Sequence, residues 1–264
     1  MPEVGELPGS DLAFLEPYLP RSGRHNEAFS SNATASDHRD IPFVTLTYAS
    51  SLDGMISLSP GVRTTLSGAE TKSMTHYLRL HHDAILVGVG TAIPDDPSLN
   101  CRYLDSTLES QPRPVIVDPK KRWDGGGKTP WLLHLKSAKD ANDVDGAFCE
   151  RLYIADDRKD ASGTAATPAM SWPIILQTLK QRGIESVMIE GGATIIATLL
   201  GMPELVDSVI VTIAPTWLGE GGVSITPAAR VSGTDRLNSA TLTKTAWRQF
   251  GPDAVLCGRL QARG

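Results

Sequence analysis

The chain has 264 residues, of which 41% are hydrophobic and 21% are charged, a composition typical of a globular protein with a sizeable core. Its 25 Lys and Arg residues against 30 Asp and Glu residues give a formal net charge of -5. This balance argues against a globally basic surface for nucleic acid or an anionic membrane, so a phosphate-bearing ligand would need a local basic pocket.

The cysteines and the N-terminus indicate the compartment. Cys101, Cys149 and Cys257 lie far apart without a C-x-x-C pair, and no His stands at a zinc-type spacing, so we expect free thiols and no metal ion. No apolar run reaches the ~18 residues that a membrane helix needs. The first ten residues carry acidic residues, Gly and Pro where a signal peptide is basic and then apolar. We therefore expect a cytoplasmic protein.

The first forty residues differ in composition from the rest. Residues 1–40 are rich in Ser, Asn and Pro around one apolar patch at 12–19, which predicts a loosely ordered N-terminal extension. Residues 41–264 are expected to form a single domain.

Short apolar runs alternate with helical patterns from residue 41 onward, which predicts a mainly parallel sheet flanked by helices. Ser67 and Glu70 fit a capping box at the start of an amphipathic helix of about four turns. Further helices are predicted over residues 171–183, with Ser171 as N-cap and Gly183 after the end, and over residues 193–200. The predicted strands span residues 43–48, 84–88, 115–118, 131–133, 152–154, 186–190 and 206–214.

The C-terminal part changes pattern. Residues 241–250 alternate, Gly, Pro and Asp form a turn signal at 251–253, and residues 254–260 are apolar again. This order predicts an antiparallel hairpin that completes a mixed sheet.

Two glycine-containing segments follow predicted strands. Gly191 and Gly192 precede the helix at 193–200, where backbone N–H groups and the helix dipole favour a phosphate. This is not the dinucleotide motif G-x-G-x-x-G, so a tight turn without a ligand is the alternative. In the other segment, residues 88–102, Thr91 and Asp95 could bond ribose hydroxyls or amides and Arg102 a phosphate, although Asp-Asp-Pro is also ordinary turn chemistry.

Taken together and in order, these blocks resemble the riboflavin-biosynthesis pyrimidine reductases, and the similarity runs from about residue 41 to the C-terminus. The free-standing fungal members are the most similar. The resemblance implies a dihydrofolate reductase-like fold with a mixed, mainly parallel α/β sheet and a C-terminal antiparallel hairpin. The blocks that carry it are Ser51-Leu52-Asp53-Gly54, the helix with Arg79, residues 83–102, Glu190-Gly191-Gly192 and residues 205–219.

Two features separate the chain from bacterial members. A fused zinc deaminase needs H-x-E and P-C-x-x-C together, and this pair is absent because the sequence contains no P-C-x-x-C motif. Bacterial reductases tend to carry a Lys just before the S-x-D-G block, whereas Thr47 stands near that point here, so a role of that amine is not carried over.

The resemblance implies an NADPH-dependent reduction of 2,5-diamino-6-ribosylamino-4(3H)-pyrimidinone 5′-phosphate to its ribitylamino product. A glycosylamine opens to an imine that accepts hydride, so the protein must hold the nicotinamide over C1′ and needs no covalent nucleophile. Two alternatives stay open: a reductase of the deaminated pyrimidine, 5-amino-6-ribosylaminouracil 5′-phosphate, and a non-catalytic dinucleotide-binding protein.

The resemblance also implies the site residues. The expected cofactor-binding residues are Thr91, Asp95, Ile154, Gly191, Gly192, Ala193, Thr194 and Ile195. The expected substrate-binding residues are Arg79, Leu99, Arg102 and Glu190. Arg102, with Arg79 as a second candidate, would pair with the 5′-phosphate, and Glu190 would hold polar groups of the substrate and move a proton as the catalytic residue.

Several of these residues have simpler interpretations. Arg79 fits a solvated helix face, and Asp53 fits a plain turn residue. Glu190 ends an apolar strand, where an unpaired carboxylate is costly, which favours a functional role.

Two further expectations concern specificity and assembly. The basic run Lys120-Lys121-Arg122 follows a predicted strand and is our hypothesis for the 2′-phosphate site of NADPH, with a solvated turn as the alternative. Members of the family are commonly homodimers, and we expect a homodimer in which the C-terminal hairpin and residues 206–214 offer apolar strands to cover an edge.

Overall fold

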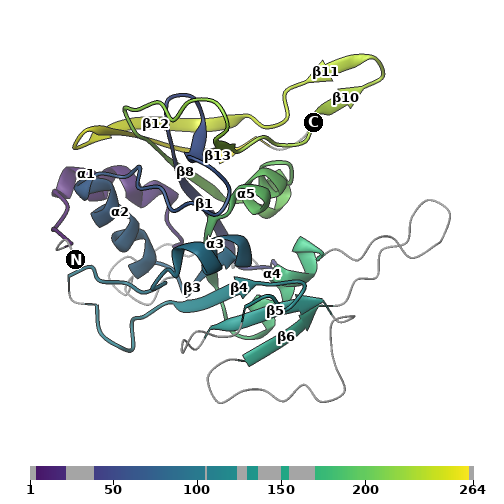
Figure 1. The fold of residues 1–264 in the computed structure, drawn as a ribbon. Coiled ribbons are helices and arrows are strands. Elements are labelled where there is room, and N and C mark those ends of the chain that lie inside the picture. Colours follow the sequence, from purple (N-terminus) through teal and green to yellow (C-terminus); the bar gives the residue numbers. More distant parts are fainter. Residues whose placement is uncertain are drawn as a thin grey trace.

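A computed structural model gives the fold and describes residues 4–21, 39–104, 106–123, 130–135, 150–154 and 170–261, without the side chains of Leu135 and Tyr153. Cys149 lies outside the described residues. Figure 1 shows the described elements, with the remaining chain as a thin grey trace.

Within the described residues, a nine-stranded sheet forms the centre of the molecule, in the order β12-β13-β8-β1-β7-β3-β4-β5-β6. The strands from β8 to β6 are parallel, whereas β13 runs antiparallel to β8 and β12 antiparallel to β13. The predicted mixed, mainly parallel sheet with a C-terminal hairpin is therefore confirmed. The strands are β1 Phe43–Ser50, β3 Ala84–Gly88, β4 Arg113–Val117, β5 Trp131–Leu135, β6 Glu150–Ile154, β7 Ser186–Gly191, β8 Ser208–Ile213, β12 Leu242–Phe250 and β13 Asp253–Leu260.

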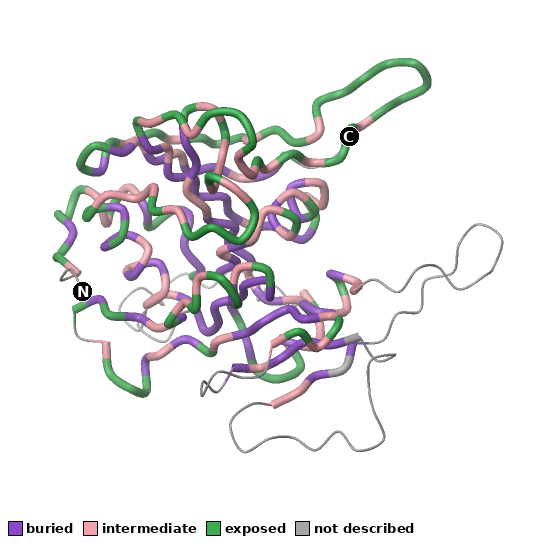
Figure 2. The backbone as a smooth tube through the Cα atoms, viewed as in Figure 1, coloured by how far each residue is buried: buried purple, intermediate pink, exposed green. Residues whose placement is uncertain are grey.

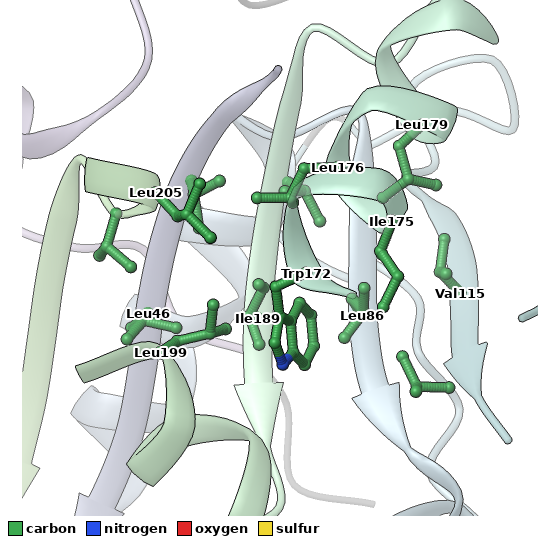
Figure 3. Packing of buried hydrophobic residues seen from close by; sticks show 14 of the residues in the cluster. Leu46, Leu86, Val115, Trp172, Ile175, Leu176, Leu179, Ile189, Leu199 and Leu205 are labelled. Carbon is green, nitrogen blue, oxygen red and sulfur yellow. The ribbon is translucent and has the colours of Figure 1, made fainter. Parts of the chain in front are cut away.

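Helices cover both faces of this sheet. Successive residues of β7 point to opposite faces: Val187 and Ile189 pack in one core cluster and Met188 in another. The first cluster takes the apolar faces of α4 and α5, as Figure 3 shows for Trp172 and Leu199, and the second takes those of α1 and α2. The helices are α1 Gly9–Leu15, η1 Glu16–Tyr18, α2 Ala69–Leu80, α3 Val89–Asp95, α4 Trp172–Gln181, α5 Ala193–Leu200 and η4 Pro203–Leu205.

Two small two-stranded sheets lie outside the central sheet within the described residues. β2 (Met55–Ser57) pairs with β9 (Val223–Ser224), and β10 (Arg230–Ser232) pairs with β11 (Asp235–Leu237). The β10–β11 hairpin projects from the molecule as an almost entirely exposed arm (Figure 2).

The N-terminal segment packs more tightly than its composition predicts. Leu7, Leu15 and Tyr18 are buried in the cluster that also holds Met74 of α2. The Arg248 guanidinium of β12 pairs with the Asp11 carboxylate at 2.5 Å. Residues 4–21 of the predicted extension thus pack against α2 and β12, because their scattered apolar residues find partners there that are distant in sequence.

The start of α2 also differs from the prediction. Gly68, not Ser67, stands at the N-cap, and its N–H donates to Asp253 Oδ2 at 2.8 Å. The Thr71 hydroxyl donates to the same oxygen at 2.5 Å. The predicted capping box is thus replaced by a carboxylate from the C-terminal hairpin, which ties α2 to β13.

Other local predictions hold. Ser171 stands at the N-cap of α4, although its side chain makes no capping hydrogen bond. Gly183 has a φ of +82°, and the following Ile184 N–H donates to Leu179 O at 3.1 Å, which closes the helix as predicted. Residues 89–95, for which no helix was predicted, form α3, which ends where Asp96 is left-handed. Among the described residues, the longest helices fall short of the length and apolarity of a membrane span.

Candidate functional site

The predicted site residues gather at the carboxyl edge of the central strands. β1, β7 and β3 are neighbours in the sheet, and β7 ends at Gly191 while β3 ends at Gly88. In open α/β sheets, ligands bind at this edge, outside the carboxyl ends of the strands. α3 begins directly after β3 and α5 begins two residues after β7 ends, so the first turns of both helices lie at these strand ends (Figure 1).

The two glycine-containing segments lie against each other, although the contacting residues Thr91 and Gly192 are 101 positions apart in the chain. A Cβ built on Gly192 would lie 2.8 Å from Thr91 Oγ1, and one built on Gly88 would lie 3.0 Å from Ile195 Cδ1. Gly191 has a φ of +130°, a conformation that L side chains rarely adopt, and its peptide bond to Gly192 is cis. Only glycine fits this close backbone approach, and the structure thereby joins two of the predicted cofactor-binding blocks.

The first turn of α5 offers backbone donors beside these glycines. Gly192 is the N-cap, without a side-chain cap, and the Ile196 N–H donates to Gly192 O at 3.1 Å. The N–H groups of Ala193, Thr194 and Ile195 precede this first helical bond and stand outside the helical ladder. Such groups at a helix N-terminus suit a phosphate or pyrophosphate, so this turn fits the phosphates of a dinucleotide.

Arg79 and Glu190 form a two-pronged ion pair next to the glycine turn. The Arg79 Nε donates to Glu190 Oε1 and its Nη2 to Oε2, both at 2.6 Å. Only 12% of the Arg79 side chain and 15% of the Glu190 side chain are exposed. Burial lowers the pKa of the Arg79 guanidinium, but the charge and hydrogen bonds of Glu190 raise it by more, so the net shift is upward. The alternative of a solvated Arg79 on a helix face is therefore wrong.

The same arginine holds the loop that carries the remaining substrate candidates. Arg79 Nη1 donates to Asn100 O at 2.8 Å, between Leu99 and Arg102. Leu99 is 2% exposed and packs in a third core cluster with Val89 and Ala92. Leu99 therefore anchors the loop next to α3.

Arg102 is exposed and lies against a histidine that the sequence patterns did not single out. His76 is buried, its Nδ1 accepts the Arg102 backbone N–H at 3.1 Å, and its Nε2 lies 3.1 Å from Arg102 Nη2. Burial lowers the pKa of His76 to about 4, and the charges of Arg79 and Arg102 act in the same direction. Its position one helical turn before Arg79 is the signal that could have found it.

Two predicted cofactor residues occupy other positions along this edge. Asp95 is partly exposed at the end of α3, where burial raises its pKa and the nearby Arg63 opposes that shift. Ile154 ends β6, which is separated from β3 by β4 and β5, and its side chain is buried in the core. Ile154 shares the carboxyl edge of the sheet but is not brought next to the glycine turns.

The basic run lies directly after β4, the neighbour of β3. Asp118, which is fully buried, accepts the Trp123 N–H at Oδ2 over 2.9 Å and so closes the turn that contains Lys120, Lys121 and Arg122. Lys120 and Arg122 are exposed. The turn thus places these cations at the carboxyl edge of the sheet, where β3 also ends at Gly88.

Asp53 does more than form its predicted turn. Its carboxylate accepts the Leu218 N–H at 3.2 Å and the Gly219 N–H at 2.8 Å, and the Ser51 hydroxyl also donates to it. These bonds, led by that from Ser51, lower the pKa of Asp53 to about 2. Asp53 therefore joins the loops that follow β1 and β8 at one side of the site.

Comparison with known proteins gives consistent matches. Residues 42–256 match the family model described as the RibD C-terminal domain. A Debaryomyces hansenii protein named 2,5-diamino-6-ribosylamino-4(3H)-pyrimidinone 5′-phosphate reductase is 39% identical over 267 residues, covering 94% of this chain and 95% of the relative. The Saccharomyces cerevisiae protein of the same name is 38% identical over 262 residues, covering 94% of each chain.

Two solved structures of similarly named proteins also align with most of this chain. The riboflavin biosynthesis reductase of Saccharomyces cerevisiae aligns with a TM-score of 0.71 at 33% identity, covering 95% of this chain and 100% of that chain. RibD from Acinetobacter baumannii aligns with a TM-score of 0.64 at 25% identity, covering 84% of this chain and 59% of the bacterial one.

Proposed function

Because this chain belongs to the RibD C-terminal domain family, we propose that it reduces 2,5-diamino-6-ribosylamino-4(3H)-pyrimidinone 5′-phosphate to the ribitylamino product in riboflavin biosynthesis. The resemblance found in the sequence blocks is confirmed by relatives of that name that align over almost the whole chain. The enzyme is an oxidoreductase, and NADPH is the proposed hydride donor.

One structural observation carries the proposal. Glu190, paired with Arg79, is followed in the chain by the Gly191-Gly192 turn that contacts Thr91. The end of β7 therefore places the Arg79–Glu190 pair, proposed to contact the substrate, directly beside the glycine turn, proposed to contact the cofactor. Such a junction suits a transfer between two ligands held side by side.

The site fits a nicotinamide dinucleotide. The close approach of Gly192 to Thr91 leaves no room for a Cβ, which suits a backbone cradle around a ligand. The N–H groups at 193–195 would hold the phosphates, while Thr91 and Asp95 would bond the sugar or amide groups. When bound, NADPH supplies hydride to C1′ of the substrate.

The chain's own residues would orient and protonate the substrate. Opening of the ribose ring breaks the bond between C1′ and the ring oxygen, forms a C1′=N bond and leaves a hydroxyl group on the sugar. Glu190, fixed by two charge-assisted hydrogen bonds, would hold the polar groups of this open form. It would accept the N–H proton that is released as the C1′=N bond forms, while the ring oxygen takes a proton from solvent, and it would return its proton to the nitrogen as C1′ is reduced. Arg102, exposed beside this pair, would bind the 5′-phosphate.

Parallel turnover assays test the substrate. We expect the diaminopyrimidine to be reduced with a higher kcat/KM than its deaminated analogue. A preference for the analogue would instead identify the reductase of 5-amino-6-ribosylaminouracil 5′-phosphate, and cofactor binding without turnover of either would identify a dinucleotide-binding protein.

We also infer a homodimer formed through the β12 edge of the sheet. β8 lies inside the sheet, because β13 of the same chain covers it, so residues 206–214 are not available to cover an edge of a second subunit. In the described sheet the two edge strands are β12 and β6, and on β12 Trp247 is 61% exposed, while the projecting arm adds Val231 at 64%. An exposed edge with apolar side chains is a pairing surface. A monomeric mass by light scattering would contradict the dimer.

We further place the enzyme in the cytoplasm. Cys101 and Cys257 are free and buried, which suits a reducing compartment.

A further inference from the structure

The N-terminal segment packs into the molecule, although the family model accounts for none of it. The match to that model begins at residue 42, so residues 4–21 lie outside the matched part of the chain. Leu7 and Leu15 are nonetheless buried in the core cluster that also holds Leu78 of α2. The segment therefore has a place in the fold to which the family match assigns no role.

The start of this segment, residues 4–8, is here called the N-terminal strap, and two of its backbone N–H groups bind side chains near the substrate residues. The Gly5 N–H donates to Ser73 Oγ of α2 at 3.0 Å. The Leu7 N–H donates to Tyr103 Oη, also at 3.0 Å, and both of these residues are buried. Because the donors are backbone groups, no sequence motif marks the strap.

Tyr103 ends the loop that carries the substrate candidates, residues 99–103, which we call the substrate loop. Near the start of this loop, Arg79 Nη1 donates to Asn100 O at 2.8 Å. At its end, the Tyr103 ring packs edge-on against Tyr77 of α2, with ring centroids 5.3 Å apart. The loop is thus held by Arg79 at one end and by Tyr77 and the strap at the other.

We propose that the N-terminal strap positions the substrate loop and thereby sets the affinity for the phosphorylated pyrimidine. Arg102, the proposed 5′-phosphate ligand, directly precedes Tyr103, so a shift of the Tyr103 backbone moves Arg102 with it. The strap residues act through Tyr103 and are positioning residues. This role rests on the proposed function, because it concerns the same substrate site.

The strap should act on the substrate and leave the cofactor unaffected. The glycine turn and its contacts belong to β7, α3 and α5, whereas the partners of the strap lie on α2 and on the substrate loop. A separate effect on the two ligands therefore distinguishes positioning of the loop from general support of the fold.

Gly5 offers a test that leaves the substrate loop itself unchanged. Gly5→Pro removes the N–H that binds Ser73, because proline has no backbone donor. Gly5→Ala keeps the N–H, and its Cβ would lie at an ordinary contact distance of 3.8 Å from Ser73 Oγ, so it is the matched control.

Tyr103→Phe removes the other acceptor and keeps the aromatic ring. Tyr18→Phe makes the same chemical change at the other end of the N-terminal segment, where the hydroxyl donates to Lys244 O of β12 at 2.7 Å. Each variant loses one hydrogen bond and should lose similar stability. A difference between them in substrate affinity is therefore not an effect of stability.

The readout is the KM for the phosphorylated substrate against the KM for NADPH. Tyr103→Phe and Gly5→Pro should each raise the substrate KM by about 3- to 10-fold, the loss expected for one neutral hydrogen bond, with the NADPH KM unchanged. Tyr18→Phe and Gly5→Ala should match the wild type. An unchanged substrate KM in Tyr103→Phe or Gly5→Pro, an equal rise in the control variants, or a parallel rise in the NADPH KM would overturn the proposal.

Amide hydrogen exchange measures the same coupling without turnover. Gly5→Pro should speed exchange in peptides that cover residues 99–103 relative to Gly5→Ala, because a loosened strap releases Tyr103. Equal exchange in the two variants would overturn the coupling. If the wild type turns over neither pyrimidine, the proposed function fails, and the exchange data still decide whether the strap holds the loop.

Discussion

Arg79 and Glu190 lie 111 residues apart in the chain, yet two hydrogen bonds of 2.6 Å join the guanidinium to both carboxylate oxygens. The pair ties the last turn of α2 to the end of β7, where the cofactor turn begins. A planar two-pronged pair fixes the direction of the carboxylate as well as its position.

Replacing Glu190 should therefore abolish most activity. Glu190→Gln keeps the shape of the side chain but loses the charge pair and the proton acceptor, and kcat/KM should fall by about 100-fold or more. Steady-state kinetics measure the loss. Glu185→Gln, an exposed Glu directly before β7 that pairs with Lys180, is the control and should behave as wild type. Equal activity of the two variants would contradict the role of Glu190.

The contact between the glycine turns should not tolerate a methyl group. Gly192→Ala puts a Cβ 2.8 Å from Thr91 Oγ1, so the turn or α3 must move, which should cost about 1–3 kcal/mol of stability and weaken cofactor binding. Urea denaturation and cofactor titration measure both effects. Gly90→Ala, which meets no atom within 4 Å, should change neither. Wild-type cofactor affinity in Gly192→Ala would show that this turn does not hold the cofactor.

Buried histidines should make the fold sensitive to acid. His82 lies between Thr45 Oγ1 at 2.8 Å and Leu78 O at 2.6 Å, and burial lowers its pKa from 6.5 to about 4. Between these two values the unfolded chain binds a proton that the folded chain does not. The free energy of unfolding should therefore fall by up to about 1.4 kcal/mol per pH unit as the pH drops through this window.

His76, with its lowered pKa, acts in the same direction. Denaturant titrations across the window measure the slope, and His82→Gln should flatten it. A slope unchanged by that substitution would show that His82 is not the cause.

The basic turn after β4 should decide between NADPH and NADH. Changing Lys120, Lys121 and Arg122 to Gln removes the cations closest in sequence to the strand end, and the ratio of NADPH to NADH efficiency should fall roughly tenfold, as for one lost charged hydrogen bond. A triple variant of Arg230, Arg236 and Lys244 removes the same charge elsewhere and should leave the ratio unchanged. An unaltered ratio in the first variant would exclude this turn as the 2′-phosphate site.

The sheet and the two glycine turns were predictable because local patterns carry them. Apolar runs such as residues 84–88 are buried on both faces of a parallel sheet, and glycine pairs after a strand mark close backbone approaches. These signals lie within a few residues of each other in the sequence.

Contacts between distant segments were not predictable in this way. Asp253 caps a helix that starts 184 residues earlier, at Ala69, and the buried Leu15 finds its partners in α2 and β13. His76 was overlooked because its partner Arg102 lies 26 residues away on a loop. Tertiary packing, not local propensity, determines each of these features.

A single turnover with deuterated NADPH tests the central claim most directly. The purified protein is mixed with cofactor labelled at the transferred position of nicotinamide C4 and with the diaminopyrimidine ribosylamino 5′-phosphate, and the product is analysed by mass and by NMR. We predict a ribitylamino product that carries deuterium at C1′, with its yield collapsing in Glu190→Gln and Arg102→Ala. Tight cofactor binding without any labelled product would contradict the account.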